Sequence, residues 1–204
     1  MITRIVKFTV PTEQIDAFKA SFATAATGSL KEPGFEQARL FAARADANTF
    51  FAYERLRDQE AHAAMPHTRQ LFEFLASSGT QVEQYNLGEA DPAPVPLSEP
   101  DVVGDDELAV FFIFSLRSGF REKVLAQFAT HTKQARMEPG NVVFDLYTIE
   151  GNEDTLIVYE RWKNEAALME KHFAHPYAQQ TGALLTEAVP GDLVEAMHFS
   201  TEIR

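Results

Sequence analysis

The stretch Glu138-Pro139-Gly140 repeats the stretch Glu32-Pro33-Gly34 at a spacing of 106 residues. The same spacing relates Tyr53-Glu54-Arg55 to Tyr159-Glu160-Arg161, and Phe22-Ala23-Thr24 to Phe128-Ala129-Thr130. Three tripeptides that recur at one shared spacing are not expected by chance, and a fixed period indicates an internal repeat. The sequence therefore predicts two copies of one module within 204 residues.

The hydrophobic pattern predicts the same order of elements in both halves, because each half can be aligned with the other. Thr12 and Ser118 are expected to cap the first helix of each half. The buried helix face has apolar residues three and four apart, as in Ile15, Phe18 and Phe22. The predicted strands are Ile2–Val10, Phe35–Ala42, Asn48–Arg55 and Gln81–Leu87, matched by Leu108–Leu116, Val142–Ile149, Thr155–Trp162 and Leu193–Thr201. Second helical stretches are predicted at Asp58–Ala76 and Asn164–Leu185, which completes the ferredoxin-like order βαββαβ.

A proline-rich segment separates the halves. Four prolines fall between Asp91 and Pro100, and this density is incompatible with a helix or a central strand. The domain prediction is therefore a first module at 1–90, a linker at 91–105 and a second module at 106–204.

The strand Val110–Phe114 is apolar on both of its faces. Leaving one apolar face in water would forfeit about 1.5–3 kcal/mol per side chain, so both faces need cover. The fold expectation is α+β: two ferredoxin-like βαββαβ modules forming an intrachain pseudo-dimeric α+β barrel. Phe111 and Ile113 are expected on the face away from the helices, and Asp145 and Tyr147 would share it.

Composition limits the function classes. The net charge is −12, with 18 basic residues among 30 acidic ones, so neither a nucleic acid nor an anionic membrane is an expected partner. The absence of cysteine excludes thiolate nucleophiles and cysteine-based metal sites. No apolar run approaches the ~18 residues of a membrane span, and no signal peptide is recognisable, so a cytoplasmic location is expected.

The second half carries a family resemblance. Tyr159-Glu160-Arg161-Trp162 is followed by Glu165-Ala166-Ala167-Leu168 and then by His172, and this pattern resembles the antibiotic biosynthesis monooxygenase (ABM) family. In the first half Leu56 replaces Trp162, and His67 would match His172 if one residue is deleted. The resemblance implies a dimeric α+β barrel in which some relatives oxidise quinols or polycyclic phenols with O2, without metal or flavin. It disfavours the haem-degrading branch, whose strand asparagine and helix tryptophan have no match here.

His172 is the candidate general base, because an imidazole titrates near neutral pH. A capping or packing role between helix and sheet is the alternative. The candidate substrate-binding residues are Phe111, Ile113, Asp145, Tyr147, Trp162 and His67. Trp162 could equally be a core residue, and Asp145 a solvated strand residue.

The remaining polar residues receive structural interpretations. His175 lies three residues after His172, but no third ligand accompanies the pair, so no metal is expected. His131 is expected at the surface or at an edge. Glu54 and Glu160 occur in both copies, which favours a structural role over a catalytic one.

The function expected from the sequence is a cofactor-independent monooxygenase-like protein that oxidises a small aromatic or quinol substrate with O2. The competing class is a non-catalytic small-molecule-binding or stress-response protein with the same barrel. No cofactor is expected. The expected partners are the substrate, O2 and, for the assembled pseudo-dimer, a second copy of the chain.

Overall fold

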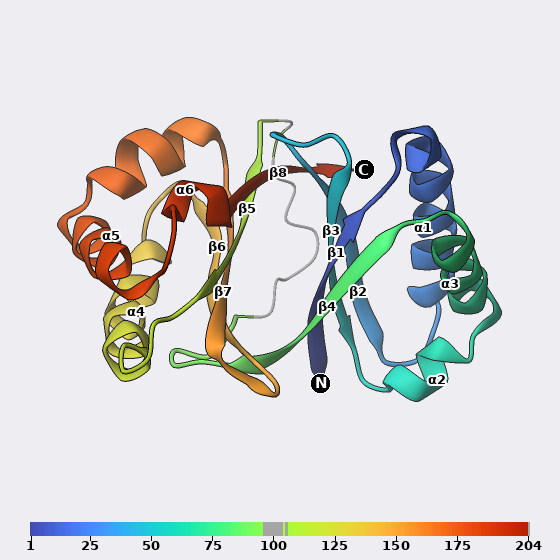
Figure 1. Cartoon of the computed structure of the whole chain (residues 1–204), viewed down its shortest axis with the longest axis horizontal. Helices are drawn as coiled ribbons and strands as arrows, with labels where there is room; N and C mark the ends of the chain where they lie inside the picture. Colours follow the sequence, from blue (N-terminus) through green and yellow to red (C-terminus); the bar gives the residue numbers. More distant parts are fainter. Residues whose placement is uncertain (96–103, 105, 204) are drawn as a thin grey trace. The chain divides into compact units, whose positions relative to one another are not determined.

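The computed structural model describes residues 1–95, 104 and 106–203, and they divide into two compact modules (Figure 1). The first module comprises Met1–Leu87 together with Glu202 and Ile203, and the second comprises Gly88–Thr201. Most of the expected linker, 96–103 and 105, lies outside the described residues.

The first module is a four-stranded antiparallel sheet with helices on one face (Figure 1). Its elements are β1 (Ile2–Thr9), the 3-10 turn η1 (Thr12–Gln14), α1 (Ile15–Ser29), β2 (Phe35–Ala43), β3 (Thr49–Leu56), α2 (Gln59–Ala63), α3 (Pro66–Ser77) and β4 (Gln81–Glu89). The strands are paired in the order β4-β1-β3-β2, which is the predicted ferredoxin-like arrangement. Phe8, Phe18 and Phe22 belong to the core between sheet and helices, so the predicted helix face is confirmed.

The second module repeats this plan. Its elements are β5 (Leu108–Ser115), α4 (Arg121–Ala135), β6 (Asn141–Ile149), β7 (Asn152–Trp162), the π-helical turn η2 (Ala167–Lys171), the 3-10 turn η3 (His172–Ala174), α5 (Pro176–Ala188), α6 (Leu193–Ala196) and β8 (Met197–Ile203). The strands are paired in the order β8-β5-β7-β6, and α4 and α5 cover one face (Figure 1). Phe112, Phe128 and Leu146 lie in the core on that face.

Three local predictions are wrong. Neither Thr12 nor Ser118 caps a helix, since α1 and α4 begin after Gln14 and Phe120 without a side-chain cap. The hydroxyl of Thr12 instead accepts a hydrogen bond from Asn48. The last predicted strand also does not begin at Leu193, because Asp192 caps the short helix α6 and β8 starts after it.

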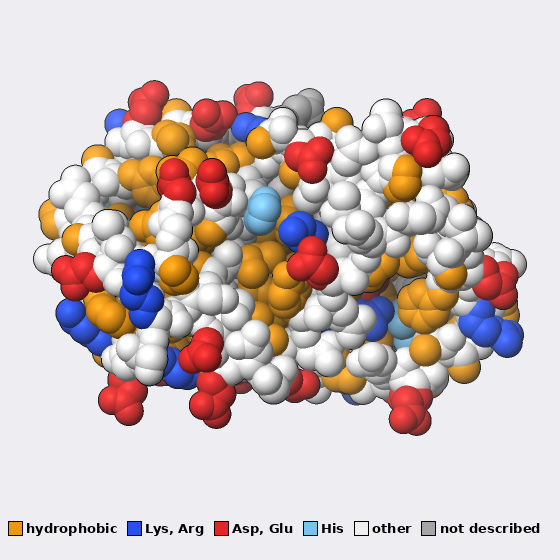
Figure 2. All heavy atoms as spheres, in the orientation of Figure 1, with side chains coloured by type: hydrophobic (Ala, Val, Ile, Leu, Met, Phe, Trp, Pro, Cys, Tyr) orange, Lys and Arg blue, Asp and Glu red, His pale blue; other side chains and the backbone are white. Residues whose placement is uncertain are grey.

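Strands β5 and β7 are buried on both faces, as their composition predicts. Phe112 and Val158 face the helices, while Phe111 and Tyr159 face the other way, and all four are at most 2% exposed. Acidic side chains are scattered over the face shown in Figure 2, with basic ones between them. No helix among the described residues is long and apolar enough to span a membrane.

Candidate functional site

A cavity of about 100 Å³ lies between the sheet and the helices of the second module. Its wall is mainly apolar and aromatic, with Phe112, Phe128, Phe144 and Phe173 among the lining residues. Three ionisable side chains also border it: Glu160, His131 and His172. A space of this size holds several water molecules or a small organic group. An apolar pocket with a few convergent polar groups is the usual form of a small-molecule site.

Glu160 is a buried carboxyl group on β7. Its partner across the sheet is Val110 on β5, a residue that offers no charge. In the first module the equivalent positions are Glu54 and Arg4, which form a buried ion pair with Arg4 Nε donating to Glu54 at 2.5 Å. Because valine stands where the first module has Arg4, Glu160 forms no ion pair among the described residues, although the two glutamates repeat in sequence.

This environment changes the acidity of Glu160. Burial raises its pKa to about 7, and the nearby Glu138 carboxylate adds to the increase. The indole N–H of Trp162 donates a hydrogen bond of 2.7 Å to Glu160 and partly offsets the effect. A group with a pKa near 7 is well suited to exchange protons at neutral pH. The structural role expected for Glu160 from sequence repetition stays a prediction, and the structure shows that its cross-strand partner differs from that of Glu54.

His172 belongs to a row of hydrogen-bonded groups. Its Nδ1 lies 2.7 Å from Glu138, and its Nε2 lies 3.2 Å from Nε2 of His131. The far nitrogen of His131 lies 2.7 Å from the hydroxyl of Thr181. The hydroxyl of Tyr177 also donates to Glu138. Both nitrogens of each imidazole therefore have partners within the module.

The row admits two proton arrangements that differ by one proton. In the first, Thr181 donates to His131, His131 to His172, and His172 to Glu138, so both imidazoles are neutral. In the second, Thr181 donates to the carbonyl of Tyr177, His131 donates to Thr181, and His172 carries a proton on each nitrogen. The row can consequently take up or release a proton without moving a heavy atom.

Burial favours the neutral arrangement. It lowers the pKa of His131 to about 3, with the neighbouring His172 contributing, so His131 is uncharged at neutral pH. Burial also lowers the pKa of His172, while Glu138 opposes that shift. The expectation that His131 lies at the surface is wrong, because it is 4% exposed and stacks on Phe128 and Phe144. Its position three residues after Phe128, on the apolar face of α4, is the sequence signal that indicates burial.

The spacing between equivalent residues of the two modules changes in the segment that joins β3 to α3 and β7 to α5. The spacing is 106 residues at Glu54 and Glu160 but 110 residues at Pro66 and Pro176, which begin α3 and α5. The π-helical turn η2 lies within the longer segment of the second module. The expectation that His67 matches His172 is therefore wrong. At the spacing of 110 residues, His62 is the counterpart of His172 and His67 is the counterpart of Tyr177. All four side chains contact the glutamate of their own Glu-Pro-Gly element.

The predicted site residues fall on different faces. Trp162 and His172 lie on the helix side of the second sheet, with ring centroids 4.6 Å apart. The residues Phe111, Ile113, Asp145 and Tyr147 lie on the opposite side, as the strand register shows, so they do not line this cavity. His67 belongs to the first module. A substrate-binding role for these five residues stays a prediction.

Asp145 is not a solvated strand residue. It is 2% exposed, and Arg136 Nη2 donates to its carboxylate at 2.6 Å. The hydroxyl of Tyr147 donates to its second oxygen at 3.3 Å. Burial raises the pKa of Asp145, and Arg136 acts in the opposite direction.

The fold and the cavity define a class of protein, a tandem of α+β modules with a cavity bordered by ionisable side chains in the second one. The family model described as "Antibiotic biosynthesis monooxygenase" matches residues 1–74 and 108–184. The chain belongs to this family, and the family model matches a segment of each module.

Solved structures show the same fold over the whole chain. One is described as "Putative monooxygenase (FN1347)" from Fusobacterium nucleatum, with a TM-score of 0.78, 13% identity, and coverage of 100% of this chain and 92% of that one. Another is described as an "anthrone oxidase-like protein", with a TM-score of 0.66, 11% identity, and coverage of 100% and 92%.

A relative in sequence matches a shorter segment. "Putative monooxygenase YcnE" of Bacillus subtilis is 38% identical over 48 residues, which are 24% of this chain and 50% of that protein. The chain spans 50–57% of the length of the curated relatives it matches.

Proposed function

We propose that the chain is a monooxygenase-like enzyme that oxidises a small electron-rich phenol or quinol with O2 in the cavity of the second module. The observation that carries this proposal is Glu160, a buried carboxyl group with a pKa of about 7 at the wall of an aromatic cavity. The membership in the ABM family supports the same class of reaction.

The proposed chemistry begins with proton transfer. Glu160 takes the proton of the substrate hydroxyl, and the resulting phenolate is electron-rich enough to pass one electron to O2. Superoxide and the phenoxyl radical then combine at a ring carbon that carries hydrogen. The resulting peroxide anion takes back the proton held by Glu160 and becomes a hydroperoxide. Loss of water then gives a quinone, so that one phenol and one O2 yield one quinone and one water. A quinol that loses two electrons and two protons to O2 yields a quinone and H2O2 instead.

His172 acts in this proposal as a proton relay and not as the group that first meets the substrate. Its Nδ1 faces Glu138 and its Nε2 faces His131, so it can receive a proton only by rearranging the row. Trp162 holds Glu160 through its indole N–H and contacts the ring of His172. We therefore assign the direct base to Glu160, a proton-relay role to His172 and a positioning role to Trp162.

The aromatic lining supports an aromatic substrate, because ring edges and faces give favourable contacts beyond simple burial. A solved structure of the same fold is described as an anthrone oxidase-like protein. No metal or flavin takes part in the proposed reaction.

The test is O2 consumption with 1-naphthol and with reduced menadione, each corrected for the rate in buffer. Wild-type protein should accelerate at least one of them, and Glu160→Gln should remove the acceleration while keeping the circular dichroism spectrum. Glu54→Gln is the matched control in the first module and should keep the activity. No acceleration by the wild type across both substrates, or full activity of Glu160→Gln, overturns the proposal.

A second function is favoured by one observation. All hydrogen-bonding positions of the two imidazoles are already occupied within the module, as in a site that binds an apolar molecule without reacting with it. Binding of the unreactive 1-methoxynaphthalene can be measured by the quenching of Trp162 fluorescence. Such binding, with no oxidation of either substrate, would support that non-catalytic role.

A further inference from the structure

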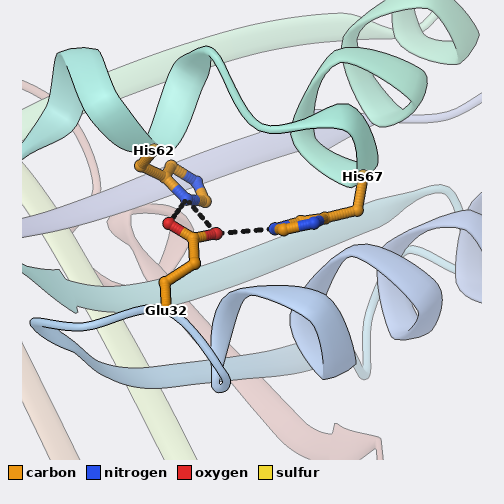
Figure 3. Close-up of side chains that lie close together, drawn as sticks. All are labelled: Glu32, His62 and His67. Carbon is orange, nitrogen blue, oxygen red and sulfur yellow. Dashed lines mark hydrogen bonds and ion pairs between the residues drawn. The ribbon is translucent and has the colours of Figure 1, made fainter.

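Three side chains of the first module converge on one point (Figure 3). Glu32 follows α1, His62 lies in α2, and His67 lies in the first turn of α3. Nδ1 of His62 is 3.1 Å from Glu32 Oε1, and Nε2 of His67 is 2.6 Å from the same oxygen. The three ligand atoms all lie within 4.8 Å of one another. Figure 3 shows both imidazoles directed at the carboxylate from different helices.

We propose that the first module binds one divalent transition-metal ion, of which Zn²⁺ is the best probe, through Glu32, His62 and His67. Two imidazole nitrogens and one carboxylate oxygen form a donor set that such ions accept at about 2.0–2.2 Å. Atoms at that radius from one ion lie about 3–4 Å apart, so small side-chain rotations suffice. A site with three protein ligands leaves a position for water or a ligand. The proposal concerns a different module from the one that carries the proposed oxidation.

The side chains of Glu32, His62 and His67 are buried to an extent that favours binding of an ion. The side chains of His62 and Glu32 are 6% and 10% exposed, and that of His67 is 20% exposed. Two donors are therefore fixed by packing, while the third gives an ion access from solvent. A cavity also borders Glu32 and His62, and it provides space for the remaining ligands of the ion.

The chain also makes room for His67. A Cβ atom at Gly28 would lie 2.5 Å from Cγ and 2.7 Å from Nδ1 of the His67 ring, closer than any real contact. Gly28 lies inside α1, where glycine is unfavourable compared with alanine. The absence of a side chain at this position leaves the space that the His67 ring occupies.

The second module provides an internal comparison. It keeps the glutamate and the first histidine as Glu138 and His172, but Tyr177 replaces His67 and Gln134 replaces Gly28. Tyr177 donates its hydroxyl hydrogen to Glu138, and His172 uses its other nitrogen for His131, whose counterpart is Ala25. Protein hydrogen bonds thus complete the network in the second module. In the first module His67 offers a ring nitrogen to the glutamate where Tyr177 offers a hydroxyl, and the alanine that replaces His131 offers His62 no side-chain hydrogen bond.

The test is a calorimetric titration of the intact, tag-free chain with Zn²⁺, with a competing chelator to measure tight binding. Wild-type protein should bind one ion, and His67→Tyr, which copies the second module, should bind it about 100-fold more weakly or not at all. Gly28→Ala changes no ligand but displaces the His67 ring, so it should weaken binding as well. His175→Gln removes an exposed histidine near Glu138 and should leave the affinity unchanged.

A second readout separates a site from a folding defect. Co²⁺ in the wild type should give visible absorption bands of nitrogen and oxygen coordination, absent in His67→Tyr, while both proteins keep the same circular dichroism spectrum. Zn²⁺ should raise the Tm of the wild type and not that of His67→Tyr. Equal binding by the wild type and His67→Tyr, or no binding by the wild type, overturns the proposal.

Discussion

The indole N–H of Trp162 donates to the carboxylate of Glu160, two residues earlier in the same strand and on the same face of the sheet. A hydrogen bond to the charged form of a carboxyl group lowers its pKa. This bond therefore limits the increase that burial imposes on Glu160.

Removing the indole donor should make Glu160 a weaker acid. Trp162→Phe keeps an aromatic ring but lacks the N–H, so the pKa of Glu160 should rise above about 7. The acid limb of the pH–rate profile for naphthol oxidation should then move to higher pH. The lost buried hydrogen bond should cost about 1–3 kcal/mol in the free energy of unfolding, measured by urea denaturation. An unshifted limb would indicate that Glu160 is not the titrating base.

Introducing into the second module the cation that the first module has should lower the pKa of Glu160. Val110→Arg places a guanidinium across the sheet from Glu160, as Arg4 lies across from Glu54. The pKa of Glu160 should fall, the acid limb should move to lower pH, and the plateau rate should drop because the carboxylate becomes a weaker base. Val110→Leu controls for the larger side chain, and the acid limb of its pH–rate profile should stay at the wild-type pH. Matching profiles of the arginine and leucine variants would count against the proposed base.

The raised pKa of Glu160 predicts a loss of stability with increasing pH. Its pKa in the folded state is about 7, against an ordinary value of 4.5 for an exposed glutamate, so the folded state binds the proton more tightly than the unfolded state does. The contribution is complete below pH 4.5 and is lost as pH rises through about 7. It amounts to about 3 kcal/mol. Urea denaturation at pH 5 and pH 8 should show this loss in the wild type, and Glu160→Gln should lack it.

The lowered pKa of His131 predicts that the free energy of unfolding changes with pH in the opposite direction. Its pKa falls from 6.5 to about 3 on folding, so the contribution to stability is present above pH 6.5 and is lost as pH falls toward 3. His131→Gln keeps hydrogen-bonding capacity without this titration. The variant should lose less stability than the wild type between pH 6.5 and pH 4, measured by thermal denaturation. Parallel curves for the two proteins would exclude a buried neutral His131.

The two proposals predict different responses to a chelator. Dialysis against EDTA should remove an ion held by Glu32, His62 and His67, and the Tm should fall. The oxidation of naphthol should persist at the same rate, because no metal takes part in it. Loss of oxidation that Zn²⁺ restores would link the two modules and overturn the metal-free reaction.

The fold could be predicted from the sequence because its signals are local. The Glu-Pro-Gly elements and the apolar spacing of Phe18 and Phe22 restrict the backbone and one helix face, and both recur at a fixed period. The fold class and the family prediction are confirmed by the family model and by solved structures that match the full length.

The site could not be predicted to the same extent, because it depends on pairs that are distant in sequence. The repeat of Glu54 and Glu160 conceals their difference, which arises from Arg4 and Val110 on neighbouring strands. A constant spacing of 106 residues with one deletion predicts that His67 aligns with His172. The spacing of 110 residues between Pro66 and Pro176 aligns His62 with His172 instead.

The exchange of Arg4 for Val110 has a consequence for how such a protein can evolve. In a homodimer encoded by one gene, every substitution appears in both subunits, so a carboxylate cannot lose its counterion in one and keep it in the other. A gene that encodes both modules on one chain removes this constraint. One copy can retain the charge pair of Arg4 and Glu54, while the other gives it up and keeps a buried carboxyl group with a raised pKa.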